Sequence, residues 1–140
     1  MSTQSHVELV KEAYAAFGAG DLQKLLGLLT PDVIWEFPVS KVIPWARTFR
    51  GPSEVAQFFA ALKEYSVLEA FEPLHFVDSD DRVVVLGRER IRVRSTDLTC
   101  SCEWAHAFTV LDGKIAGFRE YTDKAAMVSA FDKDGREMDT

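Results

Sequence analysis

"CSCEWAHAFTV", residues 100–110, alternates apolar with polar or small side chains, and this alternation decides the fold class. Cys102, Trp104, His106 and Phe108 fall on one side of the segment. A period of two predicts a β-strand with one covered face and one wet face. The covered face carries a histidine. This histidine is either a satisfied core residue or one wall of a binding site.

Three further stretches with the same period lie around this strand, and short turns separate them. Connections this short predict an antiparallel meander. The expected strands are 67–78, 82–94, 98–111 and 114–122.

The first half of the chain has helical spacing instead, with apolar residues three and four apart. The expected elements are helices at 5–18 and 22–29, a short strand at 33–37, a loop at 38–51, a helix that begins at Pro52 and a last helix at 123–131. This order predicts one α+β domain over 1–140, with a flexible tail at 132–140. A strongly curved antiparallel sheet packs against three to four helices and forms a cone with an apolar pocket.

Composition narrows the function classes. The chain has 140 residues, 47% of them hydrophobic, and a net charge of −6, which argues against a nucleic-acid-binding protein. Neither a run of about 20 apolar residues nor a signal peptide is evident, so we expect a cytoplasmic protein. Cys100 and Cys102 are then reduced core residues, and no second Cys or His pair completes a metal site.

The two faces of the 82–94 strand differ sharply. Glu89 and Gly87 share the apolar, inward face, whereas Arg88, Arg90, Arg92 and Arg94 form an outer ladder. The ladder is either a solvated face or the surface of a homodimer.

The inward face of the 114–122 strand depends on its hairpin. A three-residue loop with Gly113 in a bulge turns Phe118 and Glu120 inward, together with Ala116 and Thr122. A two-residue loop turns Arg119 and Tyr121 inward instead. We expect the first arrangement.

On that register, and with a tight hairpin at 95–98, Glu89 and Glu120 lie on either side of Trp104. Phe118 and Gly87 then flank His106, and the glycine leaves open space beside the imidazole. Burial and a like-charged neighbour raise the pKa of a carboxyl group toward neutrality, which suits a general acid or base. The alternative is a buried Glu–His ion pair that only holds the sheet together.

The motifs "AGDLQKLLGLLTPDVIWEFP", "FRGPSEVAQFF" and "DGKIAGFREYTDKAA", in this order, resemble the SnoaL-like branch of the NTF2-like (cystatin-like α+β) superfamily. The resemblance runs from Val7 to Phe131. It implies a relation to ketosteroid isomerases, polyketide cyclases and limonene-1,2-epoxide hydrolases, and also to non-catalytic domains. Fold alone therefore does not determine the function.

Single positions match these families unevenly. Glu89 and Glu120 fall where the epoxide hydrolases carry two acidic residues, but Gly87 replaces their arginine. Their water-holding Tyr and Asn fall near Trp35 and Phe37. In the ketosteroid isomerase pattern the base falls at Phe37, the donor tyrosine falls beside Tyr14, and His106 takes the place of the oxyanion-hole Asp. Polyketide cyclases of this fold use an acidic residue without a cofactor.

We therefore expect an enzyme without cofactor or metal that binds a small apolar molecule, with Glu120 and Glu89 as acid and base and His106 as polariser. It would act as an isomerase, cyclase or hydrolase. A non-catalytic ligand-binding domain and a dimerising domain are the alternatives. Trp45 is a candidate lid. The expected ligand-binding residues are Tyr14, Phe17, Trp35, Phe37, Trp45, Phe58, Phe59, Gly87, Trp104 and Phe118.

Overall fold

The computed structural model describes residues 5–132, so all of the expected tail except Asp132 lies outside the described residues. The elements in chain order are α1 (His6–Gly18), α2 (Leu22–Gly27), β1 (Leu29–Glu36), β2 (Thr48–Arg50), α3 (Gly51–Tyr65), β3 (Ser66–Ser79), β4 (Arg82–Val93), β5 (Thr99–Leu111), β6 (Lys114–Thr122) and α4 (Lys124–Ala130). The α+β class is confirmed.

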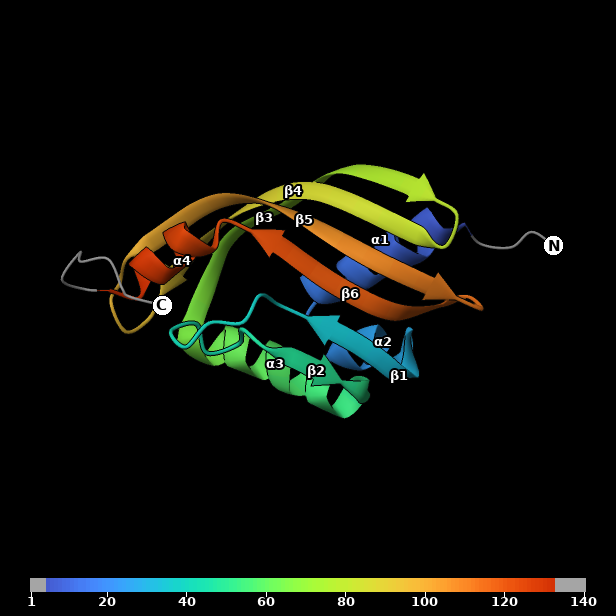
Figure 1. The fold of residues 1–140 in the computed structure, drawn as a ribbon, viewed down its shortest axis with the longest axis horizontal. Helices are drawn as coiled ribbons and strands as arrows, with labels where there is room; N and C mark the ends of the chain where they lie inside the picture. Colours follow the sequence, from blue (N-terminus) through green and yellow to red (C-terminus); the bar gives the residue numbers. More distant parts are fainter. Residues whose placement is uncertain (1–4, 133–140) are drawn as a thin grey trace.

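One sheet with the order β2-β1-β6-β5-β4-β3 forms the body of the described chain. The expected antiparallel meander is present from β3 to β6. β1 instead runs parallel to β6, so the sheet is mixed at that edge. Figure 1 shows the sheet curving over α3, with α1 and α2 toward one end and α4 toward the other. This curvature gives the sheet a concave side that the helices cover.

Two elements of the first half differ from the expectation. The second helix was expected to run to residue 29 but ends at Gly27. β1 then begins at Leu29 and includes Pro31, in the segment expected to break that helix. Pro31 lacks an amide hydrogen, but the β1–β6 pairing is irregular between Leu29 and Ile34, so no ladder bond is lost there. β2 lies inside the expected loop, where Phe49 pairs with Trp35.

The β5–β6 hairpin has a two-residue loop, which corrects the expected three-residue loop. Asp112 and Gly113 form it with φ of 51° and 78°, as a two-residue hairpin turn requires. The extra residue is Ala116, which the pairing skips between Ile115 and Gly117. This bulge reverses the facing of the strand, so Phe118 and Glu120 still point inward. Ala116 was expected to face inward only because a three-residue loop was assumed. In the structure it is the bulge residue.

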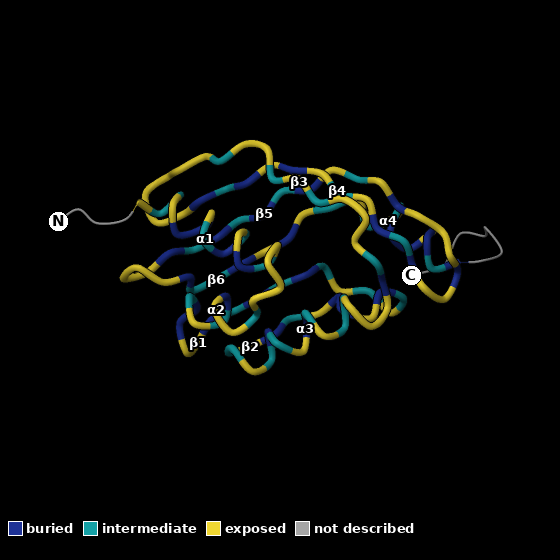
Figure 2. Tube along the Cα trace, turned by 180° about the vertical axis from the view of Figure 1, so that it is seen from behind, coloured by how far each residue is buried: buried dark blue, intermediate teal, exposed yellow. Residues whose placement is uncertain are grey.

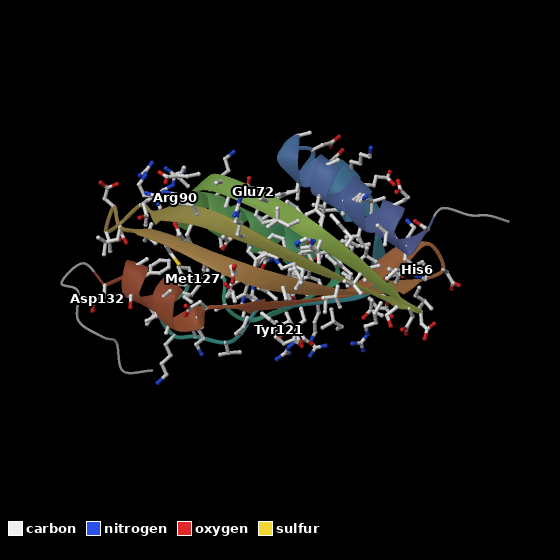
Figure 3. All side chains as sticks on the ribbon, turned by 90° about the horizontal axis from the view of Figure 1, so that it is seen from above. His6, Glu72, Arg90, Tyr121, Met127 and Asp132 are labelled. Atoms are coloured by element: carbon white, nitrogen blue, oxygen red, sulfur yellow. The ribbon has the colours of Figure 1, made fainter. Side chains whose placement is uncertain are left out.

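The covered and outer sides of the sheet differ in composition. Figure 2 shows buried residues where the sheet and the helices face each other, and exposed residues at the hairpin ends and on the outer side of α3. The outer face carries the arginine ladder, and Figure 3 shows Arg90 and Glu72 projecting from it. Three of the four ladder arginines pair within the chain: Arg88 with Glu72, and Arg90 and Arg92 with Glu69. Arg94 was expected in the ladder, but its Nε donates to the Lys63 carbonyl oxygen at the end of α3 instead.

Candidate functional site

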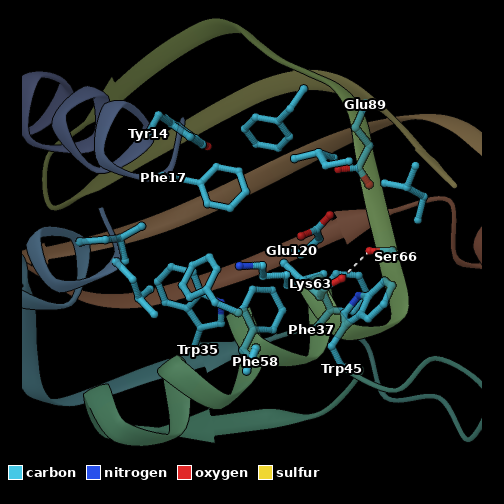
Figure 4. A pocket seen from close by; sticks show the side chains of 18 of the residues that line it. Tyr14, Phe17, Trp35, Phe37, Trp45, Phe58, Lys63, Ser66, Glu89 and Glu120 are labelled. Carbon is cyan, nitrogen blue, oxygen red and sulfur yellow. Dashed lines mark hydrogen bonds between the residues drawn. The ribbon is translucent and has the colours of Figure 1, made fainter. Parts of the chain in front are cut away.

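A cavity of about 640 Å³ lies between the concave side of the sheet and the helices. Figure 4 shows aromatic rings over much of its wall and the Glu89 and Glu120 carboxyl groups directed into it. Of the residues expected from the sequence, the structure brings these to the cavity wall: Tyr14, Phe17, Trp35, Phe37, Trp45, Phe58, Phe59, Glu89, His106, Phe118 and Glu120.

His106 lies at the centre of the polar part of the wall and is 5% exposed. Its Nε2 is 3.3 Å from Glu120 Oε1, and its Nδ1 is 2.7 Å from the Tyr14 hydroxyl. A carboxylate only accepts hydrogen bonds, so Nε2 carries the proton and Nδ1 of the neutral ring accepts the Tyr14 O–H. Burial, and then the Glu120 charge, raise the pKa of Tyr14, which keeps that phenol protonated as the donor. Both imidazole nitrogens are thus engaged.

The pairing of β4, β5 and β6 differs by two residues from the expected register. Glu120 lies opposite His106 instead of Trp104, and Phe118 lies opposite Phe108. The β4–β5 hairpin is also longer than the tight turn expected at 95–98. Four residues separate Val93 from Leu98, and Thr96 among them is buried and donates to the Ala130 carbonyl oxygen of α4.

As a result of this register, Glu89 lies opposite Cys102 and Gly87 lies opposite Trp104. The expectation that Gly87 leaves open space beside His106 is wrong. A Cβ atom at position 87 would lie 2.4 Å from the Trp104 ring and 2.5 Å from the Glu72 carbonyl oxygen. Gly87 therefore accommodates the Trp104 indole, and neither residue lines the cavity.

Trp104 supports the site from behind. Its ring stacks on the His106 imidazole at 3.8 Å between centroids with an angle of 10°, and Phe71 stacks on Trp104 at 5.0 Å. A flat ring against the imidazole fixes the plane in which its two nitrogens can bond. Trp104 is therefore a positioning residue for His106.

Glu89 is the carboxyl group that its surroundings change most. Burial, then the charge of Glu120 and then Cys102 raise the pKa of Glu89 to about 9. Glu89 is thus protonated at neutral pH and can donate a hydrogen bond. Glu89 and Glu120 share one wall of the cavity, but their different surroundings suit them to different roles in proton transfer.

The two cysteines are free thiols with different surroundings. Cys100 is buried, whereas Cys102 is half-buried, with its Sγ 3.9 Å from Glu89 Oε2 and 3.5 Å from Thr122 Oγ1. A hydrogen bond from Cys100 lowers the pKa of the Cys102 thiol to about 7. Within residues 5–132 no three His, Cys, Asp or Glu side chains gather as metal ligands. The thiols thus contribute to the environment of Glu89.

Trp45, the candidate lid, is 1% exposed and packs against Phe37 and Phe131 as part of the cavity wall. The sequence reasoning also missed polar residues that line the cavity, namely Lys63, Ser66 and Arg94. Lys63 follows Phe59 by four residues in α3, and this spacing could have placed it on the same helix face.

The chain belongs to the SnoaL-like domain family, whose sequence model matches residues 10–118. It is similar to the crystal structure of an NTF2-like protein from Burkholderia xenovorans LB400, with 36% identity, a TM-score of 0.85, and coverage of 94% of this chain and 99% of that one. The expected family and the NTF2-like fold are confirmed.

Two further solved structures are similar at 26% identity. One is an NTF2-like protein of unknown function from Burkholderia pseudomallei K96243, with a TM-score of 0.84 and coverage of 93% of this chain and 99% of that one. The other is TerC co-crystallised with polyporic acid, with a TM-score of 0.78 and coverage of 89% and 96%. No curated protein matches the chain.

Proposed function

We propose that the protein binds a small, mainly apolar molecule in the cavity and moves a proton on it without a cofactor. Such a step is common to isomerases, cyclases and hydrolases of this fold. One observation carries the proposal: the cavity holds two carboxyl groups, and the one at Glu89 is protonated at neutral pH because of burial and the Glu120 charge.

In this proposal Glu120 is the base and Glu89 is the acid. The Glu120 carboxylate takes a proton from a C–H or O–H group of the bound molecule. Glu89 gives its proton to the oxygen on which negative charge develops, so Glu120 ends neutral and Glu89 ends as a carboxylate. Return of the proton to another atom completes an isomerisation or a ring closure.

His106 acts through Glu120 in this arrangement, so the expected role of polariser becomes one of positioning. Its Nε2–H orients the Glu120 carboxylate, and the Tyr14 hydroxyl holds the other side of the ring. The ring has no nitrogen left for a ligand. Orientation of a base by a fixed neighbour is the usual way in which a buried carboxylate is kept in one geometry.

Deuterium exchange tests the proposal without knowledge of the natural substrate. The probe is 2-tetralone, an aromatic ketone with acidic C–H groups, incubated with the protein in D₂O and followed by NMR. We expect catalysed exchange, and a loss of about 10²- to 10⁴-fold in Glu120→Gln. Glu89→Gln should retain more activity than Glu120→Gln, because an amide still donates a hydrogen bond.

Glu103→Gln is the matched control, because Glu103 is exposed on the same strand as His106 and lies opposite Arg88. Its exchange rate should equal that of the wild type. Equal rates in all the variants would overturn the acid–base assignment.

A non-catalytic binding domain is the second candidate, because both nitrogens of His106 are engaged within the chain. It predicts that a ligand binds while no exchange occurs. Polyporic acid is a suitable probe, since the similar TerC was crystallised with it. Titration of the wild type and Glu120→Gln, followed by tryptophan fluorescence, separates binding from turnover.

The outer face of the sheet supports a further part of the proposal, a homodimer. Leu86 and Tyr121 are exposed there beside the paired arginines. Sedimentation at low and high salt tests it, and a monomer at both would overturn it.

Among residues 5–132 no helix has the length and apolarity to cross a membrane. Free thiols at Cys100 and Cys102 favour the cytoplasm as the proposed compartment.

A further inference from the structure

Two cations at the cavity wall have no acidic partner among residues 5–132. Lys63, near the end of α3, and Arg94, just after β4, both line the cavity. Arg94 Nε donates to the Lys63 carbonyl oxygen at 3.2 Å, and its backbone N–H donates to the Tyr65 carbonyl oxygen. Figure 4 shows the Lys63 side chain extending over the cavity. Both residues are exposed, so these two cations stand where the cavity meets solvent.

Neither cation has an acidic partner among residues 5–132, although the chain carries six more acidic than basic charges. The neighbouring ladder shows the contrast, because Arg88, Arg90 and Arg92 all pair with glutamates. Asp21 also lines the cavity, but its Oδ1 accepts the Lys24 N–H as the cap of α2. At this exposed site the two cations attract an anion through a screened, salt-dependent interaction.

We propose that the natural ligand is an anion: an apolar or aromatic body with a carboxylate, enolate or similar anionic oxygen group beside Lys63 and Arg94. This inference rests on the proposed function, because it names the substrate class of the same cavity.

A pair of fluorescent probes separates charge from apolar binding. 8-Anilinonaphthalene-1-sulfonate and N-phenyl-1-naphthylamine have the same aromatic frame and differ by the sulfonate. We expect Lys63→Gln and Arg94→Gln each to weaken binding of the sulfonate about three- to tenfold, because a hydrogen bond between two charged groups is lost. Binding of the neutral amine should stay within about twofold of the wild type, since an apolar frame depends on buried area.

Lys41→Gln is the matched control, because Lys41 is exposed in the loop before β2 and does not line the cavity. It should change neither affinity. Higher salt should weaken binding of the sulfonate to the wild type and leave the amine unchanged. Equal losses for both probes, or no loss for the sulfonate, would overturn the anion inference.

The outcomes distinguish this inference from the proposed function. Binding of both fluorescent probes with no preference in the variants overturns the anionic class and leaves the cavity as a site for neutral molecules. Absence of binding by any probe, together with absence of deuterium exchange, overturns the proposed function and the inference with it.

Discussion

The two faces of β4 carry opposite types of ionisable group, basic on the outer face and acidic on the inner face, in opposite surroundings. Arg88 and Arg90 project outward and pair with Glu72 and Glu69 in solvent. Glu89 lies between them in the sequence, yet it faces a cavity lined by aromatic rings. One strand thus presents exposed ion pairs on one side and a protonated carboxyl group on the other.

The difference shows that surroundings, and not residue type, decide what a charge does. Exposed ion pairs are screened by water and salt and contribute about 0–1 kcal/mol each. A carboxyl group removed from water changes its protonation instead, because the charged form is the one that burial disfavours. The four predictions below test this contrast, from the largest expected effect to the smallest.

Replacement of His106 with Phe should give the largest loss of stability. The ring stack on Trp104 is kept, but Glu120 becomes a buried charge without a partner and the Tyr14 hydroxyl loses its acceptor. We expect a loss of about 3–5 kcal/mol in the free energy of unfolding, measured by urea denaturation. Adding Tyr14→Phe should cost less in this variant than in the wild type. Additive losses would show that the two groups do not act together.

Gly87→Ala tests how closely the side chains pack on the inner face of β4, because it adds volume without adding charge. The added methyl group meets Trp104 and the Glu72 carbonyl oxygen at less than 3 Å. We expect a loss of about 1–3 kcal/mol and a shift of the His106 ring signals in NMR spectra, because Trp104 must move. Gly18→Ala in α1, which has open space around it, should be neutral or stabilising. Equal stability of both variants would contradict the close packing.

Glu89→Gln tests the raised pKa through the pH dependence of stability. The pKa of Glu89 lies at about 9 in the folded chain, against 4.5 for the same group in water. The folded state therefore binds the extra proton between these values, and the contribution of Glu89 is lost as the pH rises from 4.5 to 9.

The free energy of unfolding of Glu89→Gln should accordingly fall less steeply over this window than that of the wild type. Urea denaturation at pH 5, 7 and 9 measures it, and Glu72→Gln on the outer face should keep the wild-type slope. Parallel curves for Glu89→Gln and the wild type would mean that this carboxyl group is not buried as described.

Arg90→Gln should give the smallest effect. Its partners, Glu69 and Ser101, are on the exposed face of the sheet. We expect a loss of about 0–1 kcal/mol that shrinks in high salt. A loss as large as that of His106→Phe would break the contrast between the two faces.

Alternation along β4 and β5 predicted that Glu89 and His106 face the cavity. Phe118 and Glu120 face it because the bulge at Ala116 offsets the shorter loop, and alternation did not predict this bulge. The register could not be predicted, because it depends on contacts far apart in the sequence. Thr96, in the four-residue β4–β5 loop, bonds to the Ala130 carbonyl of α4. The Tyr14–His106 bond joins residues that are 92 positions apart, and no local pattern reports on it.

The proximity of Lys63 and Arg94 could not be predicted from the sequence for a related reason. Lys63 and Arg94 come together only because the end of α3 bonds to the residue that follows β4. Each is an ordinary exposed residue in its own segment. Their shared place at the cavity is a property of the tertiary fold.

The bulge at Ala116 determines which side chains of β6 face the cavity. Pairing without the bulge, with the Asp112–Gly113 turn and every residue kept, would bring Arg119 opposite His106 and Tyr121 opposite Trp104. The strand therefore encodes two alternative linings, one with a carboxylate and one with a guanidinium. A shift of one residue in the pairing of β6 would exchange a proton acceptor for an anion-binding group with no change in the sequence.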